Sequence, residues 1–204
     1  MEYSIERGMV QDFGAGPQWM FFEPLLGGMS SRDVEPRRPL SEITNTVEVD
    51  GQWVQFNLVA PYEPFLQILC GPWGSILDKE WCIENGDWDG TEASYEALND
   101  PPSGGSPLHS IANGTGPFEL ERWEPGVEVS MVRNDNYWQE PANFERLIIK
   151  VVDEWTTRKL MLEAGDADSV YVPRAFIVEL EGVEGLTVYK DLPQIQLDAF
   201  FLPV

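Results

Sequence analysis

The sequence predicts a mixed α/β protein, because segments with strand periodicity alternate with segments of helix length. Apolar and acidic side chains alternate from residue 118 to 121, and Pro125-Gly126 supplies turn residues before a second alternating segment at 127–131. Residues 147–152 form a nearly unbroken apolar segment, which is typical of a strand covered on both faces. Residues 154–164 favour a helix, so the second half of the chain combines strands and a helix.

Earlier in the chain, a helix is expected around residues 3–7, followed by a hairpin whose strands are residues 46–50 and 54–58. Asp50-Gly51 between the two alternating segments is a strong hairpin signal, because both residues tolerate the positive φ of a tight turn. Two further helices are expected at residues 78–84 and 92–98.

In the second half, residues 118–131 predict a hairpin, and the apolar strand at 147–152 is expected to be central in its sheet. The helix at 154–164 should end at Gly165, because glycine favours the left-handed conformation that terminates helices. A short strand at 169–172 would then complete an α/β unit.

The domain boundary is expected near Asn113, because residues 99–116 contain proline, glycine and serine at intervals that interrupt any periodicity. This boundary divides the chain into domains 1–113 and 114–204.

Several motifs resemble those of the extracellular solute-binding proteins, family 5, which serve peptide and nickel ABC importers. Their order along the chain is the order found in that family. They are Gly114-Thr115-Gly116-Pro117-Phe118-Glu119-Leu120, Trp123-Glu124-Pro125-Gly126, Arg133-Asn134-Asp135-Asn136-Tyr137-Trp138 and Thr156-Thr157-Arg158.

The resemblance implies part of a type II periplasmic-binding-protein-like fold. Residues 1–113 would be the accessory α+β domain, and residues 114–204 part of the first α/β ligand-binding lobe leading to the interlobe crossover. Such proteins are usually more than twice this long, so we expect an internal fragment that lacks the second lobe. The first residues show no pattern of a secretion signal.

By the same resemblance, the full protein would capture a peptide or similar small solute outside the cytoplasm and deliver it to a membrane permease, without catalysing a reaction. It would be periplasmic or a cell-surface lipoprotein. Tyr171 and Gln194 fall where the resembling lobe faces its cleft, although packing of Tyr171 on a strand is an equal alternative. Trp19 and Trp73 follow irregular, glycine- and proline-rich stretches and are further cleft candidates.

The formal net charge of −22, from 13 basic and 35 acidic residues, argues against nucleic acid or an anionic membrane as a partner. Both would require a clustered positive surface. The acidic surface either is simply solvated or attracts cationic solutes, and the charge does not identify a substrate.

Cys70 and Cys82 are the only cysteines, and an extracytoplasmic location would allow a disulfide between them. The alternative is two free buried thiols. The only histidine, His109, lies in a loop-like segment, so neither a catalytic triad nor a histidine-rich zinc site is indicated. We therefore predict no enzymatic activity.

Residues 85–96 resemble the calcium-loop template, in which oxygen ligands alternate around a glycine and a glutamate closes the loop. Asparagine at the first position and Glu92 at the eighth depart from it. The alternative is an acidic turn in which Asp87 or Asp89 caps the following helix. The candidate ligands are Asn85, Asp87, Asp89, Thr91 and Glu96.

Two other functions remain open. One is a calcium-stabilised extracellular module whose tryptophans bind a protein or glycan. The other is an enzyme that uses two carboxylates with separated pKa values, although the sequence identifies no such pair.

Overall fold

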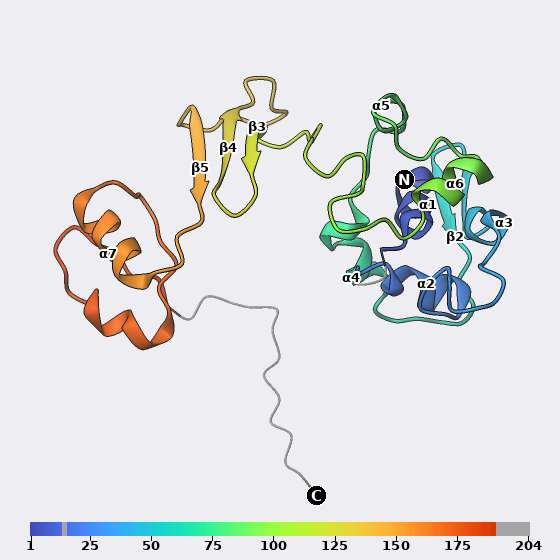
Figure 1. The fold of residues 1–204 in the computed structure, drawn as a ribbon, viewed down its shortest axis with the longest axis horizontal. Helices are drawn as coiled ribbons and strands as arrows, with labels where there is room; N and C mark the ends of the chain where they lie inside the picture. Colours follow the sequence, from blue (N-terminus) through green and yellow to red (C-terminus); the bar gives the residue numbers. More distant parts are fainter. Residues whose placement is uncertain (14–15, 191–204) are drawn as a thin grey trace, which may run out of the picture. The chain divides into compact units, whose positions relative to one another are not determined.

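The computed structural model describes residues 1–13 and 16–190 of the chain (Figure 1). They form two compact units. The N-terminal unit comprises Met1–Trp123 and Val129–Ile148, and the C-terminal unit comprises Glu124–Glu128 and the described residues 149–190. The units therefore divide within the second half of the chain, at a hairpin and inside a strand, and not at Asn113.

Helix α1 (Glu2–Gln11) is the centre of the N-terminal unit, because α2, α3, α6, β1 and η1 all pack against it. Its residues Ile5, Met9 and Val10 are almost completely buried. The predicted helices near residues 3–7, 78–84 and 92–98 are confirmed by α1, α5 and α6. The other elements of this part are α2 (Trp19–Leu26), α3 (Leu40–Thr44), β1 (Val47–Asp50), β2 (Trp53–Phe56), α4 (Phe65–Leu69), η1 (Pro72–Gly74), α5 (Lys79–Glu84) and α6 (Glu92–Leu98).

Strands β1 and β2 form the antiparallel hairpin that the sequence predicted. Val47 pairs with Phe56 at the open end and Asp50 with Trp53 beside the turn. Gly51 has a φ of 59°, a conformation that glycine adopts without a steric penalty. The turn chemistry therefore sets the register, and it directs the buried Val47 into the core.

A second sheet has the strand order β3 (Phe118–Glu124), β4 (Glu128–Arg133) and β5 (Arg146–Lys150). The β3–β4 hairpin confirms the predicted one, with Gly126 at a φ of 75° in its turn. The expectation that β5 is central is wrong, because β5 is an edge strand of this sheet. Ile148 and Ile149 are 47% and 53% exposed, so this strand is not covered on both faces by the described residues.

Helix α7 (Trp155–Ala164) confirms the predicted helix. Gly165 ends it with a φ of 79°, and its N–H donates to the carbonyl of Leu162, which satisfies one of the last helical carbonyls. The predicted strand at 169–172 is wrong: these residues are irregular, and the 3-10 helix η2 (Arg174–Glu179) follows. A strand needs a neighbour to pair with, and residues 169–172 have none among the described residues.

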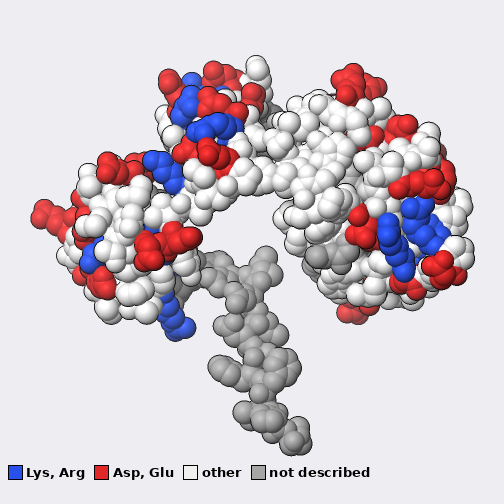
Figure 2. All heavy atoms as spheres, in the orientation of Figure 1, with Lys and Arg blue, Asp and Glu red and all other residues white. Residues whose placement is uncertain are grey.

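Acidic side chains are spread over the face drawn in Figure 2, and many of the basic side chains there lie beside acidic ones. This distribution agrees with the formal net charge of −22. No helix within residues 1–13 and 16–190 has the length and apolar character required to cross a membrane.

Three polar residues of α1, namely Tyr3, Arg7 and Gln11, find partners inside the N-terminal unit. Arg7 donates through Nη2 to Oδ2 of Asp87 at 2.6 Å, and Gln11 Nε2 donates to Oδ1 of the same carboxylate at 2.9 Å. The Tyr3 hydroxyl donates to the carbonyl of Trp88 at 2.9 Å, and the two rings stack. These contacts fasten the loop before α6 to α1.

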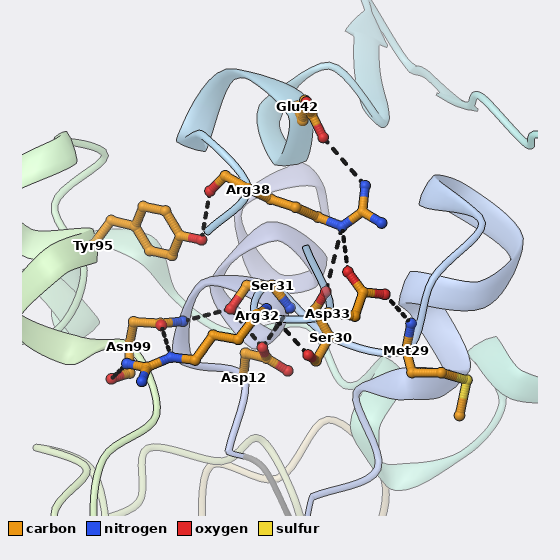
Figure 3. A network of polar contacts seen from close by, with 10 residues as sticks. All are labelled: Asp12, Met29, Ser30, Ser31, Arg32, Asp33, Arg38, Glu42, Tyr95 and Asn99. Atoms are coloured by element: carbon orange, nitrogen blue, oxygen red, sulfur yellow. Dashed lines mark hydrogen bonds and ion pairs between the residues drawn. The ribbon is translucent and has the colours of Figure 1, made fainter. Parts of the chain in front are cut away.

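A second polar network joins the end of α1, the segment after α2 and the end of α6 (Figure 3). Asp12, at a positive φ of 37°, accepts hydrogen bonds from the backbone N–H and hydroxyl of Ser31, both at 2.6 Å. Asn99 donates through Nδ2 to the carbonyl of Val10 at 2.9 Å and to Ser31 Oγ at 3.0 Å, while Arg32 Nε donates to its Oδ1 at 2.8 Å. One amide therefore links three segments.

The same network continues to α3 and α6. Arg38 forms ion pairs with Asp33 at 3.0 Å and with Glu42 at 3.2 Å, and its backbone carbonyl accepts a hydrogen bond from the Tyr95 hydroxyl (Figure 3). Tyr95 is fully buried, so this bond satisfies a hydroxyl that water cannot reach.

Replacing Asn99 with Ala should lower the free energy of unfolding by about 2 to 4 kcal/mol, because the buried Val10 carbonyl and the Arg32 guanidinium lose their partner. Urea denaturation followed by circular dichroism measures this loss. Asn143→Ala, at an exposed position, is the matched control and should change the stability little. Equal stability of the two variants would contradict the structural role of Asn99.

Glu6 predicts a pH dependence of stability. Its side chain is 6% exposed, and burial, with the Glu2 carboxylate next, raises the pKa of Glu6 to about 7. Because the folded state holds this proton more tightly than the unfolded chain, the stabilisation is complete below the ordinary pKa of a glutamate. It is lost as pH rises through 7.

When the pH rises from 5 to 8, the free energy of unfolding of Glu6→Gln should therefore increase relative to that of the unmodified chain by on the order of 2 to 3 kcal/mol. Urea denaturation at both pH values tests this, with the exposed Glu96→Gln as control. Parallel pH profiles of the Gln variant and the unmodified chain would show that Glu6 is ionised in the folded state at neutral pH.

Candidate functional site

The C-terminal unit is held together by contacts between α7 and η2. Trp155 stacks on Phe176 with ring centroids 5.3 Å apart and an interplanar angle of 13°. Lys159 Nζ lies 3.0 Å from Oε2 of Glu179. This hydrogen bond raises the pKa of Lys159 and lowers the pKa of Glu179, so the pair is ionised at neutral pH. Together the two contacts fix η2 relative to α7.

Three turns then shape the unit around a concavity. The chain reverses direction at Gly165 and continues through residues 168–172. It turns again at Gly182 and Gly185. A concavity of about 940 Å³ lies between these segments, a size typical of sites for small organic ligands. Its polar and aromatic lining includes Asp168, Tyr171, Arg174, Thr187, Tyr189 and Lys190.

Two tyrosines dominate the accessible lining. Tyr171 is 72% exposed and Tyr189 is 77% exposed, so most of both rings is free to contact a solute. A phenol ring offers apolar area for stacking and a hydroxyl for hydrogen bonding. The charged members of the lining are Asp168, Arg174 and Lys190, and Lys190 forms an ion pair with Glu181. The concavity can thus bind a solute that has both apolar and charged parts.

The four predicted ligand-binding residues have different outcomes when compared with the structure. Tyr171 lines the concavity, in contrast to the alternative of a packed strand aromatic. Trp19, the first residue of α2, and Trp73, in η1, belong to the N-terminal unit and do not line it. Gln194 lies outside the described residues.

Sequence reasoning missed Arg174 and Tyr189. A signal for Tyr189 exists in the alternation of residues 186–189, in which Leu186 and Val188 are half-buried whereas Thr187 and Tyr189 are exposed. For Arg174, the signal is Pro173 at the start of a short helical segment, which fixes the backbone direction there.

The calcium-loop template is not assembled. Asp87 faces inward and accepts from Arg7 and Gln11, while Asp89 accepts from the Thr91 N–H at 2.9 Å and from the Ser94 hydroxyl. These bonds lower the pKa of Asp89 to about 2, the one from Ser94 most strongly.

Thr91 caps α6 by accepting from the Ser94 N–H, a role that the alternative had given to Asp87 or Asp89. Asn85 donates its side-chain amide to the carbonyl of Trp81, and Glu96 is exposed on α6. Within the described residues, no group of three histidine, cysteine or acidic side chains lies close enough to hold a metal ion. The loop oxygens therefore serve capping and ion pairing.

The disulfide prediction is wrong, because Cys70 and Cys82 are free. Cys82 is fully buried in the core on α5, whereas Cys70 is exposed at the end of α4. Burial raises the pKa of the Cys82 thiol, so this side chain is a neutral core residue at physiological pH.

Comparison with known proteins shows which protein family this chain is related to. The family model described as bacterial extracellular solute-binding proteins, family 5 Middle, matches residues 1–201. The probable D,D-dipeptide-binding periplasmic protein DdpA of Escherichia coli (strain K12) is 30% identical over 119 residues, which are 58% of this chain and 20% of that protein. The nickel-binding periplasmic protein of the same strain is 36% identical over 120 residues, or 58% of this chain and 19% of that protein.

Among solved structures, the nickel ABC transporter from Bacillus halodurans is similar with a TM-score of 0.50 and 26% identity. The similarity covers 71% of this chain and 27% of that chain. The fold is thus part of a type II periplasmic binding protein, as expected from the motifs. The chain spans about a fifth of the length of these two curated relatives.

We expect calcium to change the melting temperature by less than roughly 1 °C, since a ligand stabilises a protein only through a site in its folded state. Differential scanning calorimetry with calcium chloride tests this. Magnesium chloride at equal ionic strength is the control, because any salt screens a net charge of −22. A saturable, calcium-specific increase that Asp89→Asn abolishes would restore the calcium site.

Proposed function

Because this chain belongs to the bacterial extracellular solute-binding proteins of family 5, we propose that it is part of an ABC importer component. That component would capture a small solute, such as a peptide, outside the cytoplasm and deliver it to a permease in the membrane. The observation that carries the proposal is the family match over residues 1–201. Since the chain spans about a fifth of its curated relatives, the role applies to the protein in which this segment functions.

The concavity of the C-terminal unit supports binding without chemistry. Its lining combines the exposed rings of Tyr171 and Tyr189 with the charged groups of Arg174 and Asp168. Such a lining favours reversible contact through stacking and hydrogen bonds. A carrier protein needs reversible contacts of this kind, since it must release the solute unchanged to the permease.

A peptide or related organic solute fits this lining better than a bare metal ion. Nickel sites in proteins use imidazole, thiolate or several carboxylate ligands. The only histidine, His109, lies in the N-terminal unit, where its ring is 4.9 Å from that of Trp123. Asp168 is the one acidic residue among the described side chains that line the concavity. The donor set therefore supports an organic ligand.

A thermal-shift screen of this chain with a panel of di- and tripeptides, and separately with nickel chloride, tests the proposal. Peptides should raise the melting temperature in a saturable way, because a ligand at about 100 times its Kd stabilises the folded state by about 2.7 kcal/mol. Nickel at the same concentrations should not.

Tyr171→Ala should weaken peptide binding about fivefold or more, because it removes a largely exposed ring from the concavity. Isothermal titration calorimetry measures the change. Trp138→Ala, which removes an aromatic side chain that is 73% exposed elsewhere, is the control and should leave binding unaltered. Saturable nickel binding without peptide binding would replace the peptide proposal with a metal one.

A further inference from the structure

The ratio of basic to acidic side chains varies along the chain, and it is higher in the part that provides the concavity. Residues 1–148 carry 25 acidic and 8 basic side chains, a net charge of −17. Residues 149–190, which provide the concavity, carry 8 acidic and 5 basic side chains, a net charge of −3. Basic side chains therefore offset a larger share of the acidic charge here than in residues 1–148, which makes an anion less disfavoured.

Among the described residues, Arg174 is a cation without an ion-pair partner. Within residues 149–190, ion pairs join Lys159 to Glu163 and Glu179, and Lys190 to Glu181, and none involves Arg174. Arg174 lines the concavity, and no hydrogen bond to another described residue occupies the N–H donors of its guanidinium.

The backbone that carries Arg174 is fixed. It is the first residue of η2, directly after Pro173, whose ring restricts φ. The stacking of Phe176 on Trp155 and the ion pair of Glu179 with Lys159 hold the same helix from the other side. A guanidinium on a fixed backbone loses less freedom on binding than one on a mobile loop, and its planar fork matches a carboxylate through two parallel hydrogen bonds.

We propose that Arg174 binds a carboxylate of the solute while Tyr171 and Tyr189 contact its apolar or aromatic part. The ligand class is thus a small organic acid with an apolar group, of which a peptide with a free C-terminus is one example. This inference rests on the proposed function and names the group that the site recognises.

The test is isothermal titration calorimetry of the chain with a peptide in two forms, one with a free C-terminal carboxylate and one with a C-terminal amide. The free acid should bind at least about tenfold more tightly than the amide. Arg174→Gln should weaken binding of the acid to the level of the amide and leave binding of the amide unchanged. Arg174→Lys, which keeps the charge but loses the fork, should give an intermediate affinity.

Lys150→Gln is the matched control, since it removes the same charge from an exposed position outside the concavity and should preserve the preference for the acid. Equal affinity for acid and amide, or an equal loss in Arg174→Gln and Lys150→Gln, would overturn the role of Arg174 and leave solute binding intact. Binding of neither form would overturn both this inference and the assignment of the concavity as the peptide site. Binding of the acid that also requires Tyr189 would support the full arrangement.

Discussion

The N-terminal unit depends on one constraint: α1 is enclosed by its neighbours, so Arg7 and Gln11 need partners inside the protein. Arg7 and Gln11 meet this need through the single carboxylate of Asp87, whose side chain is completely buried. Removing one member of such a buried pair leaves an uncompensated charge, which is why these contacts specify the position of the loop before α6. The capping of α6 by Thr91 then follows from that position.

The C-terminal unit is organised differently. It has one stacked aromatic pair and one ion pair between α7 and η2, and Trp155 and Leu180 are its principal buried apolar residues. The loops and turns of this unit form the concavity, as is common for binding residues held on a small rigid support. Its modest core leaves aromatic area accessible that a fully packed unit would bury.

Local signals in the sequence were sufficient where the structure is decided locally. Asp50-Gly51 and Pro125-Gly126 identified both hairpins, and Gly165 identified the end of α7. These local signals failed where contacts between residues far apart in the sequence determine the structure. The direction of the Asp87 side chain depends on Arg7, which is 80 residues away in the sequence. A calcium-loop template that considers only residues 85–96 therefore could not predict it.

The same reason explains the failure at β5 and at the site. An apolar segment specifies that a strand prefers to be covered, but not that a covering layer lies within the described residues. Tyr171 was predicted from its position in the family pattern, whereas the three-dimensional path after Gly182 and Gly185 brings Tyr189 to the same concavity. The cysteines could not be paired from spacing, because burial of Cys82 is decided by the packing of α5.

The open edge of β5 gives ionic strength two opposing effects on this protein. No strand of the described residues pairs with the outer edge of β5, and an apolar strand edge of this kind is a template on which a second copy can add a strand. Mutual repulsion between molecules of net charge −22 opposes that encounter, yet the same repulsion within one molecule works against its compact state. Added salt relieves both. Salt concentrations that stabilise the fold of one molecule are therefore also those at which its copies associate most easily. The useful salt concentration for this chain lies between the concentration at which the fold is destabilised and the concentration at which the copies associate.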